Sequence, residues 1–212
     1  MDKLRAYFEA LAERWDGIQP LDRGDRLRQM LAPFEALLGV SRAILEVGTG
    51  TGALIPCLQQ AAPGARLVSI DLAGEMLQRA RQRCPDASVV QADAHRLPFL
   101  ASGFDLVVCH NAFPHFADKP GALRSLACML RPGGHLLIVH DLSRERVNAI
   151  HGSGGEAIRN DLLPPGAETM RMLLQVGFAD VYHVEDTDEH YRVAGRWAGD
   201  RQGGSGHTPA PI

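Results

Sequence analysis

The chain has 212 residues, with 22 Lys and Arg against 25 Asp and Glu, so its formal net charge is −3. Its hydrophobic fraction of 45% and charged fraction of 22% are typical of globular domains and exclude a wholly disordered chain. A slightly acidic balance also argues against binding nucleic acid through bulk basicity, so we expect no nucleic-acid partner.

The first forty residues show helical spacing. Apolar residues recur every three or four positions from Leu4 to Trp15, and again from Leu27 to Leu38, with Gly39 as the expected stop. Pro33 lies inside the second stretch and predicts a kink or a break there. We expect two N-terminal helices that cap the substrate side of the fold.

From residue 43 short apolar runs alternate with helical stretches. The predicted strands are Ala43–Val47, Arg66–Ile70, Ser88–Gln91, Phe104–Cys109, His135–His140, Val181–Val184 and Tyr191–Ala194. The predicted helices are Ala53–Ala61, Ala73–Arg83, Lys119–Leu130, Ser143–His151 and one that ends at Val176 before Gly177. Apolar strands alternating with helices favour an α/β fold with a parallel sheet covered on both faces. The last two strands are separated by a short turn, which predicts an antiparallel hairpin at the end of the sheet.

The chain shows no internal repeat and no second core, which predicts one domain over residues 1–197. Within it, residues 1–40 form the helical cap and 41–197 the core, and the glycine-rich residues 198–212 are predicted to be a disordered tail. Four cysteines lack CxxC spacing, and no apolar run is long enough to span a bilayer. We therefore expect a cytoplasmic monomer or homodimer without an integral membrane segment.

Three glycines stand at every second position between the first predicted strand and its helix. Gly48, Gly50 and Gly52 allow the backbone to turn sharply and allow a ligand to lie against the main chain. The amides that begin the following helix favour polar or anionic groups. An ordinary turn needs one glycine, so the spacing predicts a ligand-binding loop.

A glycine loop of this kind is compatible with two ligands, a dinucleotide and S-adenosylmethionine. Gly48, Gly50 and Ala53, with Asp71 about twenty residues on, satisfy the dinucleotide fingerprint, so an NAD(P)-linked oxidoreductase stays open. Glu46, just before the glycines, is unfavourable beside a pyrophosphate but compatible with a cationic amino-acid group. The sequence therefore favours S-adenosylmethionine over a dinucleotide.

Two further carboxylates support that choice. Asp71 ends the second predicted strand, where it can accept from two ribose hydroxyls, and Asp93 follows the third, where it can meet an adenine edge. With these residues the sequence resembles the class I S-adenosylmethionine-dependent methyltransferases, in particular the small-molecule branch of the ubiquinone/menaquinone biosynthesis methyltransferases. The matching segments are Glu46–Gly52, Asp71, Gln91–Phe99, Phe104–Val108 and Leu130–Gly134, with Trp15-Asp16 near the N-terminus.

The resemblance implies a fold, a cofactor and a set of residues for it. The fold is a doubly wound, Rossmann-like, seven-stranded and mostly parallel sheet of order 3-2-1-4-5-7-6, with strand 7 antiparallel. The implied cofactor-binding residues are Glu46, Gly48, Thr49, Gly50, Gly52, Asp71, Leu72, Asp93, Ala94 and His110. In that set the glycines pass under the methionine and ribose, Asp71 holds the ribose hydroxyls, and Leu72 and Asp93 contact the adenine. His110 lies near the methionine end.

Histidines are concentrated where the fourth and fifth predicted strands end. In such a sheet the substrate meets the cofactor beyond these strand ends. His110, His115 and His140 are the candidate catalytic residues, and His115, His140 and His151 are weaker candidates for a metal site. The alternative is that these histidines are separate polar residues at the rim, with no shared catalytic or metal-binding role. The Gly152–Gly155 and 160–165 segments are expected to form a lid. A non-catalytic module that binds the cofactor or a metal also stays open, as does the acceptor atom.

Overall fold

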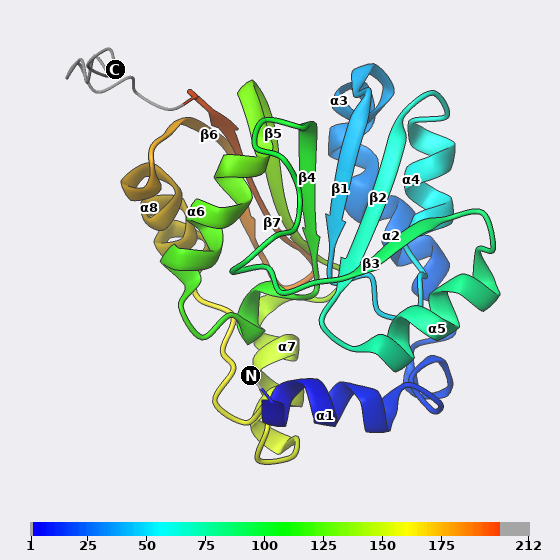
Figure 1. Cartoon of the computed structure of the whole chain (residues 1–212). Helices are drawn as coiled ribbons and strands as arrows, with labels where there is room; N and C mark the ends of the chain where they lie inside the picture. Colours follow the sequence, from blue (N-terminus) through cyan, green and yellow to red (C-terminus); the bar gives the residue numbers. More distant parts are fainter. Residues whose placement is uncertain (1, 200–212) are drawn as a thin grey trace, which may run out of the picture.

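The computed structural model describes residues 2–199; the predicted disordered tail lies outside them from residue 200 onward. A seven-stranded sheet of order β3-β2-β1-β4-β5-β7-β6 forms its centre (Figure 1). Its strands are β1 Ala43–Val47, β2 Arg66–Asp71, β3 Ser88–Gln91, β4 Phe104–His110, β5 Leu130–His140, β6 Phe178–Asp186 and β7 Tyr191–Trp197. Strands β1 to β5 pair in parallel, whereas β7 is antiparallel to both β5 and β6. The predicted fold class and strand order are confirmed.

Helices cover both faces of the sheet, as the apolar strands predicted. They are α4 Ile55–Ala61, α5 Gly74–Arg83, α6 Lys119–Met129, α7 Arg144–Ser153 and α8 Gly166–Val176, with a 3-10 turn, η3, at Phe113–His115. Alternate residues of β1 enter different layers: Leu45 packs on the side of α6 and α8, and Ile44 on the side of α4. Gly177 ends α8 in the left-handed region (φ 113°), as expected of a helix stop.

The N-terminal segment forms shorter pieces than predicted. These are α1 Asp2–Leu11, η1 Asp16–Ile18, α2 Arg23–Leu31, η2 Ala32–Phe34 and α3 Glu35–Val40. Pro33 stands in η2, which confirms the predicted break. The first helix ends four residues before Trp15. Gly39 was wrong as a stop, because α3 runs one residue further, to Val40.

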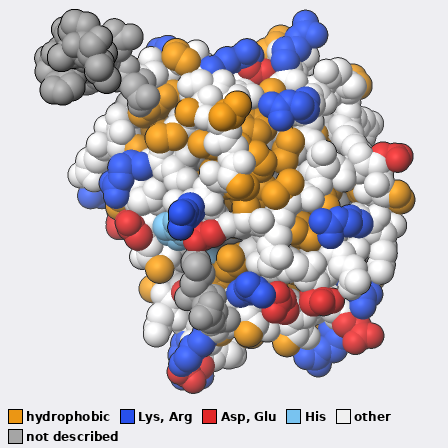
Figure 2. Space-filling view, in the orientation of Figure 1, with side chains coloured by type: hydrophobic (Ala, Val, Ile, Leu, Met, Phe, Trp, Pro, Cys, Tyr) orange, Lys and Arg blue, Asp and Glu red, His pale blue; other side chains and the backbone are white. Residues whose placement is uncertain are grey.

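The carboxyl ends of the parallel strands meet at one edge of the sheet, and α1 lies across this edge with α7 beside it (Figure 1). Helix α1 thus stands over the edge where ligands bind in open α/β sheets. The apolar residues of α2, η2 and α3 pack instead on the face of the sheet that α4 covers, so the second predicted cap helix belongs mainly to the core. On the face shown in Figure 2, Lys and Arg side chains stand in separate groups among uncharged and acidic ones. In residues 2–199, no helix combines the length and apolarity needed to cross a membrane.

Candidate functional site

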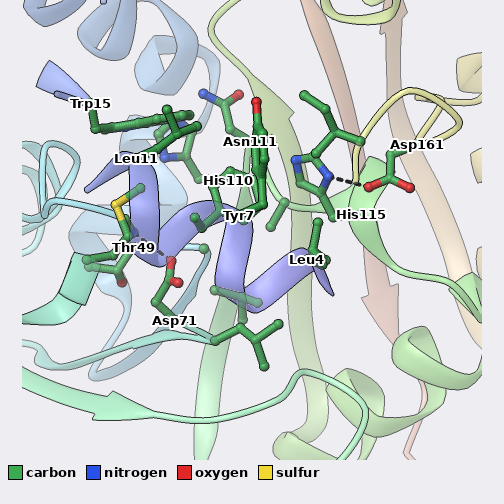
Figure 3. A pocket seen from close by; sticks show the side chains of 18 of the residues that line it. Leu4, Tyr7, Leu11, Trp15, Thr49, Asp71, His110, Asn111, His115 and Asp161 are labelled. Carbon is green, nitrogen blue, oxygen red and sulfur yellow. Dashed lines mark hydrogen bonds and ion pairs between the residues drawn. The ribbon is translucent and has the colours of Figure 1, made fainter. Parts of the chain in front are cut away.

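A cavity of about 670 Å³ lies between α1 and the carboxyl ends of β1, β2, β4 and β5. Its size falls in the range of about 300–1,000 Å³ that small-molecule sites occupy. Figure 3 shows Thr49 and Asp71 at one end, His115 and Asp161 at the other, and His110 between them. Leu4, Tyr7 and Leu11 of α1 form part of its wall. The residues predicted for cofactor and for substrate, except Glu46 and Gly52, therefore share one cavity.

The glycine loop after β1 is held by its backbone. The N–H groups of Gly48 and Thr49 both donate to the carbonyl of Ile70, at 2.9 and 3.0 Å. Gly48 has φ 86°, and a Cβ there would lie 2.6 Å from the carbonyl oxygen of His110. Gly48, Thr49 and Gly50 line the cavity. Gly52 does not, because it packs against Ala80 of α5.

Asp71, the last residue of β2, faces the cavity beside this loop. Its two carboxylate oxygens accept from the backbone N–H groups of Gly50 (2.8 Å) and Ala73 (2.9 Å), which fix its orientation. Burial raises the pKa of Asp71, and these hydrogen bonds oppose that rise. Leu72 follows it along the cavity wall. A fixed carboxylate with lone pairs to spare fits the hydroxyls of a ribose.

Asp93 and Ala94 line the same end of the cavity, as predicted. Oδ1 of Asp93 accepts from the backbone N–H of His95 at 3.0 Å and lies 2.9 Å from Nδ1 of the same histidine. His95 also lines this end, and the sequence had not singled it out. Its position two residues after Asp93 was the available signal.

Glu46 is buried beneath the loop and does not line the cavity. Ser69 donates its hydroxyl to Oε2 at 2.6 Å, whereas Oε1 has no hydrogen-bond partner among residues 2–199. Burial raises the pKa of Glu46 to about 7. In this position Glu46 can support the loop from beneath but does not contact a ligand in the cavity, although the resemblance implies it among the cofactor-binding residues.

The Trp15-Asp16 segment closes over the glycine loop. Thr51 donates its hydroxyl to Asp16 at 2.7 Å, and Arg83 donates to the other oxygen of Asp16 at 2.5 Å. The indole nitrogen of Trp15 lies 3.9 Å from the position of a Cβ at Gly50. The N-terminal cap is therefore tied to the loop by side-chain contacts.

His110 and His140 end β4 and β5, and both are buried while still lining the cavity. Burial lowers the pKa of His110 to about 4, against the attraction of Asp141, and also lowers the pKa of His140. Both imidazoles are therefore neutral at pH 7. Asn111, which follows His110, donates its side-chain amide to Asp141 at 2.6 Å and so joins the two strand ends.

His115, in η3, is paired with Asp161. Its Nδ1 lies 2.8 Å from Oδ2 of Asp161, and both residues line the cavity (Figure 3). The ring of His115 also stands edge-on to Phe8 of α1, 5.0 Å between centroids. Asp161 precedes α8 and was expected only as part of a lid. It is 46 residues from His115, and no local pattern joins the two.

Of the two segments predicted as a lid, only Asp161 lines the cavity, beside Ala157 and Ile158 from the stretch between the segments. Gly152 belongs to α7 instead of a loop. Asn148 of α7 holds the backbone of Leu163 through two hydrogen bonds, at 2.8 and 3.1 Å, and does not line the cavity.

The predicted metal set of three histidines is not assembled. The rings of His115 and His151 lie 4.8 Å apart, but Nδ1 of His151 bonds the carbonyl of Asp161. The ring of His140 packs instead against Tyr191, 5.6 Å away. Throughout the described part of the chain, no group of three or more His, Cys, Asp or Glu is placed to hold a metal ion.

Comparison with known proteins identifies relatives along the chain. A family profile described as "Methyltransferase domain" matches residues 45–138. The malonyl-[acyl-carrier protein] O-methyltransferase of Halorhodospira halophila is 31% identical over 185 residues, covering 84% of this chain and 61% of that protein. The demethylmenaquinone methyltransferase of Thermus thermophilus is 36% identical over 138 residues, covering 62% of this chain and 63% of that protein. The chain thus spans about three fifths of the length of these relatives.

Solved structures share the fold. A SAM-dependent methyltransferase from Aquifex aeolicus superposes with a TM-score of 0.68 at 17% identity, covering 87% of this chain and 97% of that one. The relatives therefore confirm the resemblance to methyltransferases, and the solved structures confirm the fold.

Proposed function

We propose that this chain, whose residues 45–138 carry a methyltransferase domain, transfers a methyl group from S-adenosylmethionine to a small-molecule acceptor. The observation that supports this best is the cavity that joins the glycine loop and Asp71 to the His115–Asp161 pair. One end offers groups for a nucleoside, and the other offers a base. The N-terminal cap covers both ends.

The residues at the nucleoside end fit the cofactor. Asp71 would hold the ribose hydroxyls, and Leu72, Asp93 and Ala94 would contact the adenine. Gly48 lets the loop after β1 lie close to the end of β4, because a Cβ there would overlap the carbonyl of His110, and its backbone lines the cavity. When bound, the cofactor supplies a methyl group already activated on a sulfonium. The protein therefore contributes mainly alignment.

His115 is the base in this proposal. Because the carboxylate of Asp161 can only accept, Nδ1 of His115 carries the proton between them, and Nε2 is left able to accept one. An acceptor that arrives protonated would lose its proton to Nε2, and Asp161 would stabilise the imidazolium that forms. Burial lowers the pKa of His110 and of His140, so both are weak bases and would hold the acceptor through hydrogen bonds without taking its proton.

The acceptor in this proposal is a small molecule with an apolar body and an acidic proton. Leu4, Tyr7, Phe8, Leu11, Ile150 and Ile158 give the cavity its apolar surface. Relatives are named for demethylmenaquinone and for malonyl-[acyl-carrier protein], which are acceptors of different size. The base and the apolar wall together favour an acceptor of the demethylmenaquinone kind, in which a hydroxyl or a carbon acid loses the proton.

A screen of acceptors tests this proposal. Phenols, hydroquinones, thiols, amines and carboxylic acids are incubated with S-adenosylmethionine, and S-adenosylhomocysteine release is measured with added divalent metal or with chelator. We expect release with a phenol or hydroquinone class, unchanged by chelator. Release that requires a divalent metal would contradict His115 as the base, and stabilisation by NAD alone would contradict methyl transfer.

We also propose a cytoplasmic location and no nucleic-acid partner. The four cysteines, Cys57, Cys84, Cys109 and Cys128, are unpaired, as is common in reducing compartments. The charge balance of −3 and the dispersed Lys and Arg side chains of Figure 2 offer little to a phosphate backbone.

A further inference from the structure

Two arginines lie largely buried in this fold, and they differ in what they bind. Arg192 of β7 has 5% of its side chain exposed and donates to the carbonyls of Met30 (3.0 Å) and Gln29 (2.8 Å) and to Glu185. Its guanidinium is satisfied by the protein. A buried arginine in this position stabilises the fold by joining α2 to the sheet.

Arg23, the first residue of α2, is different. Its side chain is 14% exposed and lines the cavity, yet it donates no hydrogen bond within residues 2–199. The nearest carboxylates are those of Asp16, 3.7 Å from Nη1, and Asp141, 3.9 Å from Nε. Both distances exceed a hydrogen bond. A desolvated guanidinium without hydrogen bonds is costly unless a ligand completes it.

Each of the two neighbouring carboxylates accepts hydrogen bonds from groups other than Arg23. Asp16 accepts from Arg83 and Thr51, and Asp141 accepts from Asn111. Neither carboxylate accepts a hydrogen bond from Arg23, whose side chain lines the cavity. Arginine is the side chain whose planar fork best matches a carboxylate, through two parallel hydrogen bonds.

The position of Arg23 in the cavity indicates which ligand carboxylate it could bind. Asp16, beside Arg23, is bonded to Thr51 in the glycine loop, and Asp141 stands at the end of β5 near His110. Arg23 therefore lies where the loop after β1 meets the strand ends of β4 and β5, at the methionine end of the proposed cofactor site. We propose that Arg23 binds the α-carboxylate of the cofactor, an assignment that rests on the proposed function.

Two ligands that differ by this carboxylate test the assignment. Dissociation constants for S-adenosylmethionine and for decarboxylated S-adenosylmethionine are measured by calorimetry on the full chain. We expect the unmodified chain to prefer the carboxylated ligand by about 10- to 100-fold, the worth of a charge-assisted pair. Arg23→Met should bring that preference close to one, and Arg23→Lys should keep part of it.

Arg83→Met is the matched control, because Arg83 also pairs with Asp16 but does not line the cavity. It should keep the full preference. An equal affinity for both ligands in the unmodified chain would overturn the proposal, as would an unchanged preference in Arg23→Met. A chain that binds neither ligand contradicts the proposed function instead. Melting temperatures of the variants establish that each is folded.

Discussion

In the half of the cavity beside β1, β2 and β3, the ligand-facing groups are held by backbone hydrogen bonds. The amides of Gly48 and Thr49 bond to β2, and those of Gly50 and Ala73 fix Asp71. In the half beside β4 and β5, side chains hold other side chains, as in the His115–Asp161 and Asn111–Asp141 pairs. We call these the backbone half and the side-chain half. From this difference we expect mutations in the backbone half to change cofactor affinity, and mutations in the side-chain half to change turnover.

The largest expected effect comes from the side-chain half. His115→Ala removes the proposed base, so turnover with the acceptor found in the screen should fall by about 10²- to 10⁴-fold. The dissociation constant for S-adenosylhomocysteine should change less than about twofold, because His115 is not among the groups proposed to hold the cofactor. Initial rates and calorimetry measure the two quantities.

His135→Ala is the control for that variant. His135 lies outside the cavity, with Nδ1 3.0 Å from the hydroxyl of Tyr182, so its loss should leave turnover unchanged. Asp161→Asn should reduce turnover less than His115→Ala, since the imidazole remains. Full activity in His115→Ala would contradict the role of His115 as the base.

The next effect lies in the backbone half. Gly48→Ala places a Cβ 2.6 Å from the carbonyl of His110 at a φ of 86°, so both overlap and backbone strain oppose it. We expect the free energy of unfolding to fall by about 2–4 kcal/mol, with loss of cofactor affinity. Gly17→Ala, with nothing within 4 Å of its Cβ, should change stability by less than about 0.5 kcal/mol. Equal denaturation midpoints for the two variants would contradict the strain at Gly48.

The smallest effect is a pH dependence that has opposite signs in the two halves. Burial raises the pKa of Glu46 from 4.5 to about 7, so between these values the unfolded chain has lost a proton that the folded chain keeps. Its contribution to stability therefore falls as the pH rises from 4.5 to 7, by at most ~3 kcal/mol. For His110, whose pKa burial lowers from 6.5 to about 4, stability is lost as the pH falls through that interval.

Glu46→Gln isolates the first of these contributions. The amide still accepts from Ser69 but does not ionise, so the variant should gain about 1–3 kcal/mol relative to the unmodified chain between pH 5 and pH 8. Urea unfolding at the two pH values measures this difference. A difference that is the same at both would show that Glu46 is not buried as a neutral acid.

The backbone half could be predicted from the sequence because its parts are local. Gly48 and Asp93 follow strands and Asp71 ends one, in the order that the alternating pattern gives, and parallel strands bring their ends together. The exception is Glu46, whose side chain points into the interior beside Ser69. Alternation along β1 places Leu45 and Val47 on one face and Glu46 on the other. The alternation therefore predicts that Glu46 is buried, whereas the glycine motif does not.

The side-chain half could be predicted only in part. The strand-end histidines were found because they follow predicted strands, but Arg23 and Asp161 come from a cap helix and from the segment before α8. Their places depend on tertiary packing, such as the bonds from Asn148 to Leu163 that hold the latter segment. The weaker metal candidates His115, His140 and His151 are not assembled for the same reason, since Asp161 engages His115 and His151 and the ring of His140 packs against Tyr191.

The separation of the two halves is tested most directly by calorimetric titration of the unmodified chain, His115→Ala and Asp71→Ala with S-adenosylhomocysteine and with NAD. We predict that the first two bind S-adenosylhomocysteine equally, that Asp71→Ala binds it at least about tenfold more weakly, and that NAD binds to none of the three. Binding of NAD without S-adenosylhomocysteine, or loss of S-adenosylhomocysteine binding in His115→Ala, would contradict the account.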